Sequence, residues 1–170
     1  MKRLTLTQFG NPILRKKAKP ILIKDIKSKK IRTLIENMFF TVDDIGVGLA
    51  APQVGESLQL AVLEVKPLPH RMKIKSFPKT VIINPKIIKY SRDTELGWEG
   101  CLSCSNDKGD KGEQGTALLW GKVPRSKQVT VKFYDALGVA HIKTYVGFTA
   151  RVFQHEVDHL NGILFIDKAK

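Results

Sequence analysis

The pentapeptide His155-Glu156-Val157-Asp158-His159 places two histidines four residues apart, with a glutamate directly after the first. On a helix, positions i and i+4 share a face, so both imidazoles can bind one cation, and Glu156 can polarise a water at that cation. A catalytic metal site needs three protein ligands and one open position. After His159 only Asp167 is a further candidate ligand before the chain stops at Lys170. The third ligand is therefore expected upstream of the motif.

Length and composition predict one globular domain over residues 1–170, since 42% of the 170 residues are hydrophobic and no apolar run approaches the length of a membrane span. Residues 1–12 lack the apolar core and small-residue cleavage site of a signal peptide, so we expect a cytoplasmic protein with no membrane contact. The two cysteines lie together in Cys101-Leu102-Ser103-Cys104. In a reducing compartment this spacing indicates metal or redox chemistry rather than a structural disulfide.

The charge of the chain is strongly basic: 29 lysines and arginines against 16 acids give a net charge of +13. Between Arg15 and Lys30 there are eight basic residues and a single acid, Asp25. Such a segment attracts polyanions through counterion release, and RNA is the cytosolic candidate. The alternative is a solvated surface that keeps the protein soluble. No aromatic residues are interleaved with these charges, so the pattern is not typical of a module that reads nucleic acid.

Hydrophobic spacing predicts an amphipathic helix over residues 29–43 and a second helix over residues 147–161, which ends at Asn161-Gly162. Residues 104–122, rich in Gly, Asp, Asn and Lys, are predicted to form a flexible loop. Four runs are typical of strands, over residues 58–65, 80–84, 129–134 and 141–146. This order favours an α+β fold in which antiparallel β-sheets surround a central helix carrying the H-E-x-x-H motif.

Three stretches resemble the signature motifs of the peptide deformylase family and occur in that family's order: Gly46-Val47-Gly48-Leu49-Ala50-Ala51-Pro52-Gln53, Glu99-Gly100-Cys101-Leu102-Ser103 and Gln154-His155-Glu156-Val157-Asp158-His159. Shorter stretches at residues 9–15, 83–85, 123–125 and 160–167 are also similar to the family. The similarity covers most of the chain. It departs at residues 104–122, an atypical inserted loop in a segment that lines the substrate groove in the family.

The resemblance implies a metal-dependent hydrolase that removes the N-formyl group from the initiator methionine of new polypeptides and releases formate. Cys101, His155 and His159 would hold the metal. Glu156 would take a proton from water and pass it to the leaving amine. The family implies Fe(II), although a Cys-His-His set also suits Zn(II), Ni(II) or Co(II).

The remaining motif residues are expected to bind the substrate. The side-chain amide of Gln53 and the backbone N–H of Leu102 match the family's donors to the oxyanion that forms on the formyl oxygen. The backbone around Val47 and Gly48 would pair with an extended peptide like an added strand. The apolar residues assigned to the methionine pocket are Val47, Phe148 and Val152.

Other polar residues near the motifs receive structural roles. Glu99 is expected to order the loop around Cys101, and Asp158 to lie on the helix surface or in an ion pair. His70 and His141 lack partners at metal spacing and are expected to be exposed. The two residues assigned to the mouth of the cleft, where they would meet the peptide, are Arg125 and Arg151.

Two other functions remain open from the sequence. One is a metallopeptidase, but the third metal ligand that such enzymes commonly have downstream of the motif is missing here. The other is a basic RNA- or ribosome-associated domain with a closed structural site of Cys101, Cys104 and the two histidines, which would leave Glu156 without a role. Cys104 otherwise points into solvent or core, or pairs with Cys101 on oxidation.

The expected partners follow from the implied reaction and from the charge. The substrates are N-formylmethionyl nascent peptides, and the protein is expected to act as a monomer. Many bacterial relatives continue past the stretch ending at Asp167 into a helix that docks on the ribosome, whereas this chain ends at Lys170. We expect the basic segment 15–30 to replace part of that contact with ribosomal RNA.

Overall fold

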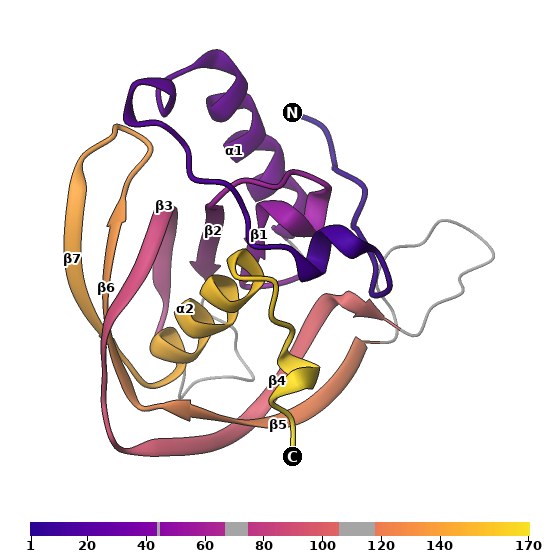
Figure 1. Cartoon of the computed structure of the whole chain (residues 1–170), viewed down its shortest axis with the longest axis vertical. Coiled ribbons are helices and arrows are strands. Elements are labelled where there is room, and N and C mark those ends of the chain that lie inside the picture. Colours follow the sequence, from indigo (N-terminus) through magenta and orange to yellow (C-terminus); the bar gives the residue numbers. More distant parts are fainter. Residues whose placement is uncertain (44, 67–74, 106–117) are drawn as a thin grey trace.

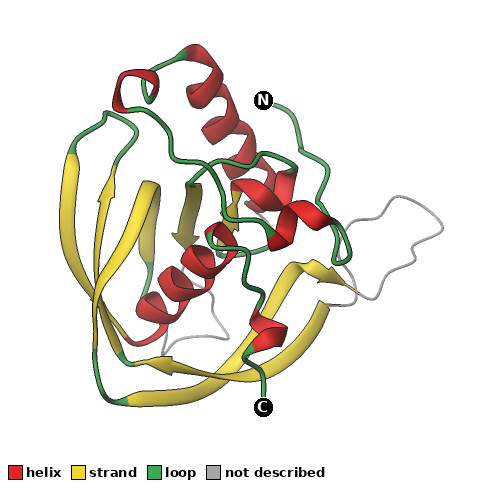
Figure 2. Ribbon diagram, viewed as in Figure 1, coloured by secondary structure: helices red, strands yellow, loops and turns green. Residues whose placement is uncertain are grey.

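The computed structural model describes residues 1–43, 45–66, 75–105 and 118–170. The described chain forms two antiparallel sheets and two α-helices, α1 (Lys29–Val42) and α2 (Gly147–Leu160) (Figures 1 and 2). The larger sheet has, in spatial order, β1 (Gly48–Ala50), β2 (Leu60–Val65), β3 (Phe77–Tyr90), β6 (Gln128–Tyr134) and β7 (Ala140–Val146). The smaller sheet pairs β4 (Thr94–Ser105) with β5 (Leu118–Ser126). The predicted α+β fold is confirmed.

Helix α1 begins at a side-chain cap, since the Ser28 hydroxyl accepts a hydrogen bond from the Ile31 N–H at 3.3 Å. Its apolar face packs on β1 and β2 in a core cluster with Leu49, Leu60 and Val62. The helical residues buried in that cluster are Ile31, Leu34, Ile35, Met38 and Val42. The predicted helix is confirmed and ends one residue earlier than expected.

Helix α2 lies at the centre of the molecule, between the five-stranded sheet and the β4–β5 pair (Figures 1 and 2). Gly147 has φ +58°, a left-handed conformation that lets the chain turn directly from β7 into the helix. Phe153 is fully buried against the larger sheet together with Val131 and Phe133. This packing turns the opposite side of α2 towards β4.

The segment before α1 is tied to the larger sheet through Asn84, which has φ +51°. Its side chain accepts a hydrogen bond from the Ile21 N–H at 2.8 Å and donates one to the Ile21 carbonyl at 2.7 Å. Asparagine adopts the left-handed region more readily than most other residues, so it suits this backbone position. Farther upstream, the Phe9 N–H donates to the Ser103 carbonyl at 2.7 Å, so the N-terminal segment also holds β4.

The smaller sheet is the main departure from the sequence-based expectation. Neither β4 nor β5 was predicted, and residues 118–122 of the expected loop belong to β5. Residues 104 and 105 of that expected loop belong to β4, and its remaining residues, 106–117, lie outside the described residues, as does His70. No helix in the described part of the chain is long and apolar enough to cross a membrane.

Candidate metal centre

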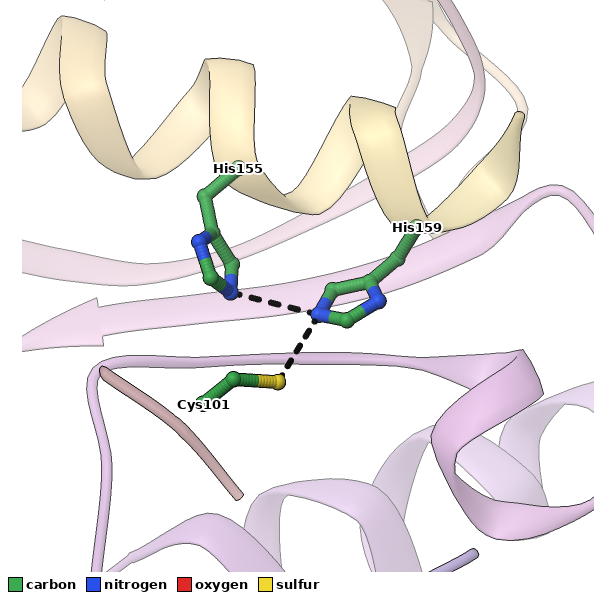
Figure 3. Close-up of side chains that lie close together, drawn as sticks. All are labelled: Cys101, His155 and His159. Carbon is green, nitrogen blue, oxygen red and sulfur yellow. Dashed lines mark hydrogen bonds between the residues drawn. The ribbon is translucent and has the colours of Figure 1, made fainter. Parts of the chain in front are cut away.

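Three potential metal ligands converge between the two sheets. Strand β4 supplies Cys101, and one face of α2 supplies His155 and His159 (Figure 3). The Cys101 Sγ lies 3.3 Å from the His159 Nε2, which lies 3.2 Å from the His155 Nε2. All three ligand atoms lie within 4.8 Å of one another, and all three residues are largely shielded from solvent. The third ligand expected upstream is therefore close to the two histidines.

The donor set fits a tetrahedral metal ion. Metal–nitrogen and metal–sulfur bonds of about 2.1 and 2.3 Å place neighbouring donor atoms about 3.4–3.6 Å apart, close to the two separations from His159 Nε2 given above. The Cys101 sulfur faces the Ser103 N–H at 3.4 Å and the Gln53 side-chain N–H at 3.5 Å. The neighbouring Cys104 and burial nevertheless raise the pKa of the Cys101 thiol well above its usual value, so a metal that binds the thiolate must displace its proton. Cys104 is buried but does not join this group of ligands, which argues against a closed four-ligand site.

Glu99 orients the first histidine. Its Oε2 lies 3.0 Å from the His155 Nδ1, so that the histidine's Nε2 points to Cys101 and His159. Burial would raise the pKa of Glu99, but hydrogen bonds from Arg125 and His155 lower it to about 2. The carboxylate is therefore ionised and fixes the imidazole as a ligand, an arrangement that recurs behind metal-binding histidines.

The two histidines differ in their protonation. Burial lowers the pKa of His159 well below its usual value, so this imidazole is neutral. Burial also acts to lower the pKa of His155, but the hydrogen bond to Glu99 and the nearby charge of Glu156 outweigh it and raise the pKa. A metal therefore competes with a proton for the Nε2 of His155, and metal affinity falls in acid.

Two buried arginines hold Glu99 in place. The Nε of Arg125 donates to Glu99 Oε1 and its Nη2 to Oε2, both at 2.9 Å, and Arg151 donates to Oε1 at 2.8 Å. Arg125 also pairs with Asp158, which confirms the expectation of an ion pair there. Arg125 is 4% and Arg151 is 8% exposed. The expectation that both meet the peptide at the cleft mouth is wrong for Arg125, whereas Arg151 lines the cleft from a buried position.

A histidine on the larger sheet also differs from expectation. His141 is only partly exposed, because its Nε2 lies 2.7 Å from the Asp135 carboxylate and its ring stacks on Phe133. This pair lies at the end of the β6–β7 hairpin, away from the three ligands. It is a local structural contact.

Arg125→Leu is expected to lower the free energy of unfolding by about 3 kcal/mol, because it leaves the buried charge of Glu99 with Arg151 alone among the arginines and that of Asp158 with Lys168 alone. Urea unfolding of the two proteins measures the difference. The matched control is Arg15→Leu, which breaks a pair with Asp167 whose side chains are 42% and 37% exposed. That change is expected to cost less than about 1 kcal/mol. Equal effects of the two substitutions would contradict the importance of the buried network.

Glu156 is placed as a proton acceptor beside the ligands. It is 3% exposed, and its Oε2 has no hydrogen-bond partner among the described residues. Burial raises its pKa to about 7. A Cβ at position 48 would lie 2.3 Å from the Glu156 Oε1, so the glycine there makes room for the carboxylate. A buried carboxylate with a pKa near neutrality suits general-base chemistry.

The metal-free protein is expected to become less stable as the pH rises from 4.5 to about 7, in part because Glu156 must then ionise in a buried site. Its folded-state pKa is raised, so the folded protein binds its proton more tightly than the unfolded chain, and that contribution is lost through this window. In the wild type, ionisation of Glu156 is expected to lower the free energy of unfolding by about 3 kcal/mol across this window, and Glu156→Gln should lack that decrease. Urea unfolding at pH 5 and 7.5 measures it. Glu36→Gln, on the exposed face of α1, should keep the wild-type profile.

The same residues open onto a cavity of about 390 Å³. Gln53 accepts a hydrogen bond from the Ala50 N–H at 2.8 Å through Oε1, which directs its amide N–H towards Cys101 and the Ser103 hydroxyl. Of the ten site residues expected from sequence, nine line this cavity and only His159 does not. The nine are Val47, Gly48, Gln53, Cys101, Leu102, Phe148, Val152, His155 and Glu156.

Two tryptophans that were not expected from the sequence, Trp98 and Trp120, also line the cavity. A signal was present for the first, since Trp98 directly precedes the Glu99-Gly100-Cys101 stretch. Trp120 was hidden because it falls in the segment expected to be a loop.

Comparisons with known proteins agree over nearly the whole chain. The family model described as polypeptide deformylase matches residues 3–170. Peptide deformylase 2 of Nostoc is 38% identical over 98% of this chain and 86% of its own length, and the peptide deformylase of Thermotoga neapolitana is 39% identical over 95% and 84%. The class I type b peptide deformylase of Acinetobacter baumannii, solved with Met-Ala-Ser bound, superposes with a TM-score of 0.86 at 34% identity, covering 98% of both chains. The Thermotoga maritima peptide deformylase gives a TM-score of 0.80 at 35% identity, covering 99% of this chain and 98% of its own.

Proposed function

Because the chain belongs to the polypeptide deformylase family, we propose that Cys101, His155 and His159 hold its metal ion and that the ion is Fe(II). The resemblance seen in the sequence is confirmed. The protein is a metal-dependent hydrolase that removes the N-formyl group from newly made polypeptides. The observation that supports the ligand assignment is the group of one thiol and two imidazole nitrogens within 4.8 Å, beside a buried carboxylate.

The choice of Fe(II) rests on the family, because a thiolate with two imidazoles also suits Zn(II), Ni(II) and Co(II). Any of these divalent ions would supply Lewis acidity, lowering the pKa of water and polarising the formyl carbonyl.

Glu156 carries the proton in the proposed reaction. It accepts a proton from the attacking water as the oxygen bonds to the formyl carbon, and delivers it to the amine nitrogen as the C–N bond breaks. Its pKa of about 7 suits both steps, because the group can take up and release a proton near neutral pH. Formate and a peptide with a free amino terminus are the products.

The other motif residues bind the substrate. The Gln53 amide N–H and the Leu102 backbone N–H are proposed to donate to the formyl oxygen as it gains negative charge. The backbone of Val47 and Gly48 is proposed to pair with the extended peptide, so that these hydrogen bonds contribute affinity for any peptide sequence. Phe148 and Val152, on the first turns of α2, are proposed to complete the apolar methionine pocket with Val47. The relative that binds Met-Ala-Ser supports a peptide in this cleft.

Formate release from formyl-Met-Ala-Ser tests the function directly. The protein is purified anaerobically, loaded with Fe(II) and compared with the same protein loaded with Zn(II), Ni(II) or Co(II). Acetyl-Met-Ala-Ser is the matched control, because the small cavity at the ligands is expected to exclude the larger acyl group. Formate release that requires metal supports the proposal. A folded, metal-loaded protein that releases no formate would contradict it.

We also propose that the protein acts as a cytoplasmic monomer whose basic segment, residues 15–30, contacts ribosomal RNA. Figure 1 shows this segment in indigo, running from the short helix η1 (Pro12–Arg15) to the start of α1. Arg15 is partly neutralised by Asp167. The lysines of the segment are all exposed, namely Lys16, Lys17, Lys19, Lys24, Lys27, Lys29 and Lys30. Exposed cations in this density support phosphate binding by counterion release.

Replacing Lys16, Lys17, Lys24 and Lys27 with glutamate is expected to weaken co-sedimentation with ribosomes more than tenfold and to reduce its dependence on salt. The matched control reverses four exposed lysines of the larger sheet, Lys86, Lys89, Lys132 and Lys143, and should bind like the wild type. Unchanged ribosome binding after reversal of Lys16, Lys17, Lys24 and Lys27 would contradict this proposal.

A further inference from the structure

One face of the smaller sheet carries apolar side chains that are not covered by the rest of the described chain. Trp98 lies opposite Lys122, and Gly100 lies opposite Trp120. Directly opposed residues in an antiparallel pair share a face, as do residues two apart along a strand. Trp98 and Trp120 therefore project from the same face, and they are 61% and 54% exposed. Large apolar groups exposed together usually mark a binding surface.

The two indole rings are held in place. A Cβ on Gly100 would lie 3.1 Å from three ring atoms of Trp120, so this ring lies directly against the Gly100 backbone. The Lys122 ammonium lies 5.4 Å from the centre of the Trp98 ring, within the range of a cation–π contact. Rings fixed in this way lose little conformational entropy when they bind a ligand.

Both tryptophans line the same cavity as the proposed metal ligands and Glu156. The reacting formyl group must lie at the ligands, and the methionine side chain is assigned to the pocket of Val47, Phe148 and Val152. The peptide backbone is assigned to Val47 and Gly48, and successive side chains of an extended peptide point in opposite directions, so the side chain of the next residue faces another wall of the cavity. That wall is formed by β4 and β5, where Trp98 and Trp120 stand.

We propose that Trp98 and Trp120 bind the side chain of the residue that follows formylmethionine, and that they make the enzyme favour peptides in which this residue is apolar or aromatic. The inference rests on the proposed function and adds a substrate class to it. Indole faces attract apolar and aromatic side chains, and aromatic pairs add stabilisation beyond simple burial. A cationic residue is disfavoured, because Lys122 already occupies one face of Trp98.

Intrinsic fluorescence offers a direct binding measurement, since the chain contains two tryptophans and both line the cavity. The product peptide Met-Phe-Ser is titrated into the metal-loaded protein, and Met-Ser-Ser is the matched peptide. Met-Phe-Ser is expected to shift the emission to shorter wavelength and to bind threefold to tenfold more tightly. Trp98→Phe and Trp120→Phe then show which ring reports the binding. No change in emission at saturating Met-Phe-Ser would overturn the proposal.

Kinetics with formylated peptides test the consequence for the reaction. The wild type is expected to show a threefold to tenfold higher kcat/KM for formyl-Met-Phe-Ser than for formyl-Met-Ser-Ser, mainly through KM. In Trp98→Ala and Trp120→Ala this ratio should fall to about one. Leu96→Ala is the matched control, because Leu96 is 51% exposed on the same strand and does not line the cavity. It should keep the wild-type ratio.

The possible results distinguish a failure of this inference from a failure of the proposed function. Formate release with the same ratio in the wild type and in both alanine variants would overturn the role of the tryptophans and leave the function intact. Absence of formate from every formylated peptide would instead contradict the proposed function, and this inference with it.

Discussion

Glu156→Gln is expected to lower kcat for formate release by about 1,000-fold, with little change in KM and with the metal still bound. Glutamine has the same size as glutamate and fits the space left by Gly48, but it cannot accept a proton. The proton from the attacking water then has no acceptor beside the ligands. Anaerobic kinetics together with metal analysis measure the rate and the metal content of the same sample.

The matched control for this substitution is Asp158→Asn, which changes the other carboxylate of the same motif. Asp158 pairs with Arg125 and Lys168 and does not line the cavity. We expect it to reduce stability more than activity, with kcat within tenfold of the wild type. If Glu156→Gln kept a rate near the wild type, another group would have to move the proton.

Cys101→Ser is expected to lower metal affinity by more than 100-fold and to remove nearly all activity. Removing even a group that only orients a ligand typically costs 10–100-fold in metal affinity, and Cys101 is proposed to bind directly. Serine also offers a hydroxyl in place of a soft thiolate. Metal content after dialysis, measured by mass spectrometry of the metal, checks the result without relying on activity.

Cys104→Ser is the control that the chain itself provides. Cys104 is 1% exposed and three residues from Cys101, yet it is outside the ligand group of the described residues. It should retain metal content and activity close to the wild type. Loss of metal or of the fold in this variant would instead favour a closed structural site of four ligands.

The sequence was sufficient for the helices and for most of the site. Helices α1 and α2 have regular apolar spacing that ends at clear glycine-containing stretches, and their predicted bounds are accurate to one residue at the C-terminal end. The motif residues could be assigned because three short stretches in order resemble one family. The sequence alone did not show that these residues line one cavity, since Gln53, Cys101 and His155 come from different elements of the fold.

The smaller sheet could not be predicted, because β4 reverses the usual pattern of burial. Its buried positions include Glu99 and Cys101, while Leu96 and Trp98 are exposed. The alternation of hydrophobic residues therefore predicts the wrong face of the strand to be buried. Glycines at positions 97 and 100 also weaken the prediction of a strand. The burial of Arg125 was missed for the same reason, since a charged residue enters a core only with partners that the sequence does not place beside it.

The contacts of the site join distant parts of the chain. Cys101 and His159 are separated by 58 positions, His155 and Glu99 by 56, and Gln53 and Cys101 by 48. Contacts that close long loops form late in folding, because the chain entropy must be lost before they can stabilise anything. Hairpins such as β6–β7 can therefore form early, whereas the ligands assemble only when both sheets have docked on α2. A partly folded chain would have neither the Cys101 thiol nor the Glu156 carboxylate in place, so the protein would become active only at the last step of folding.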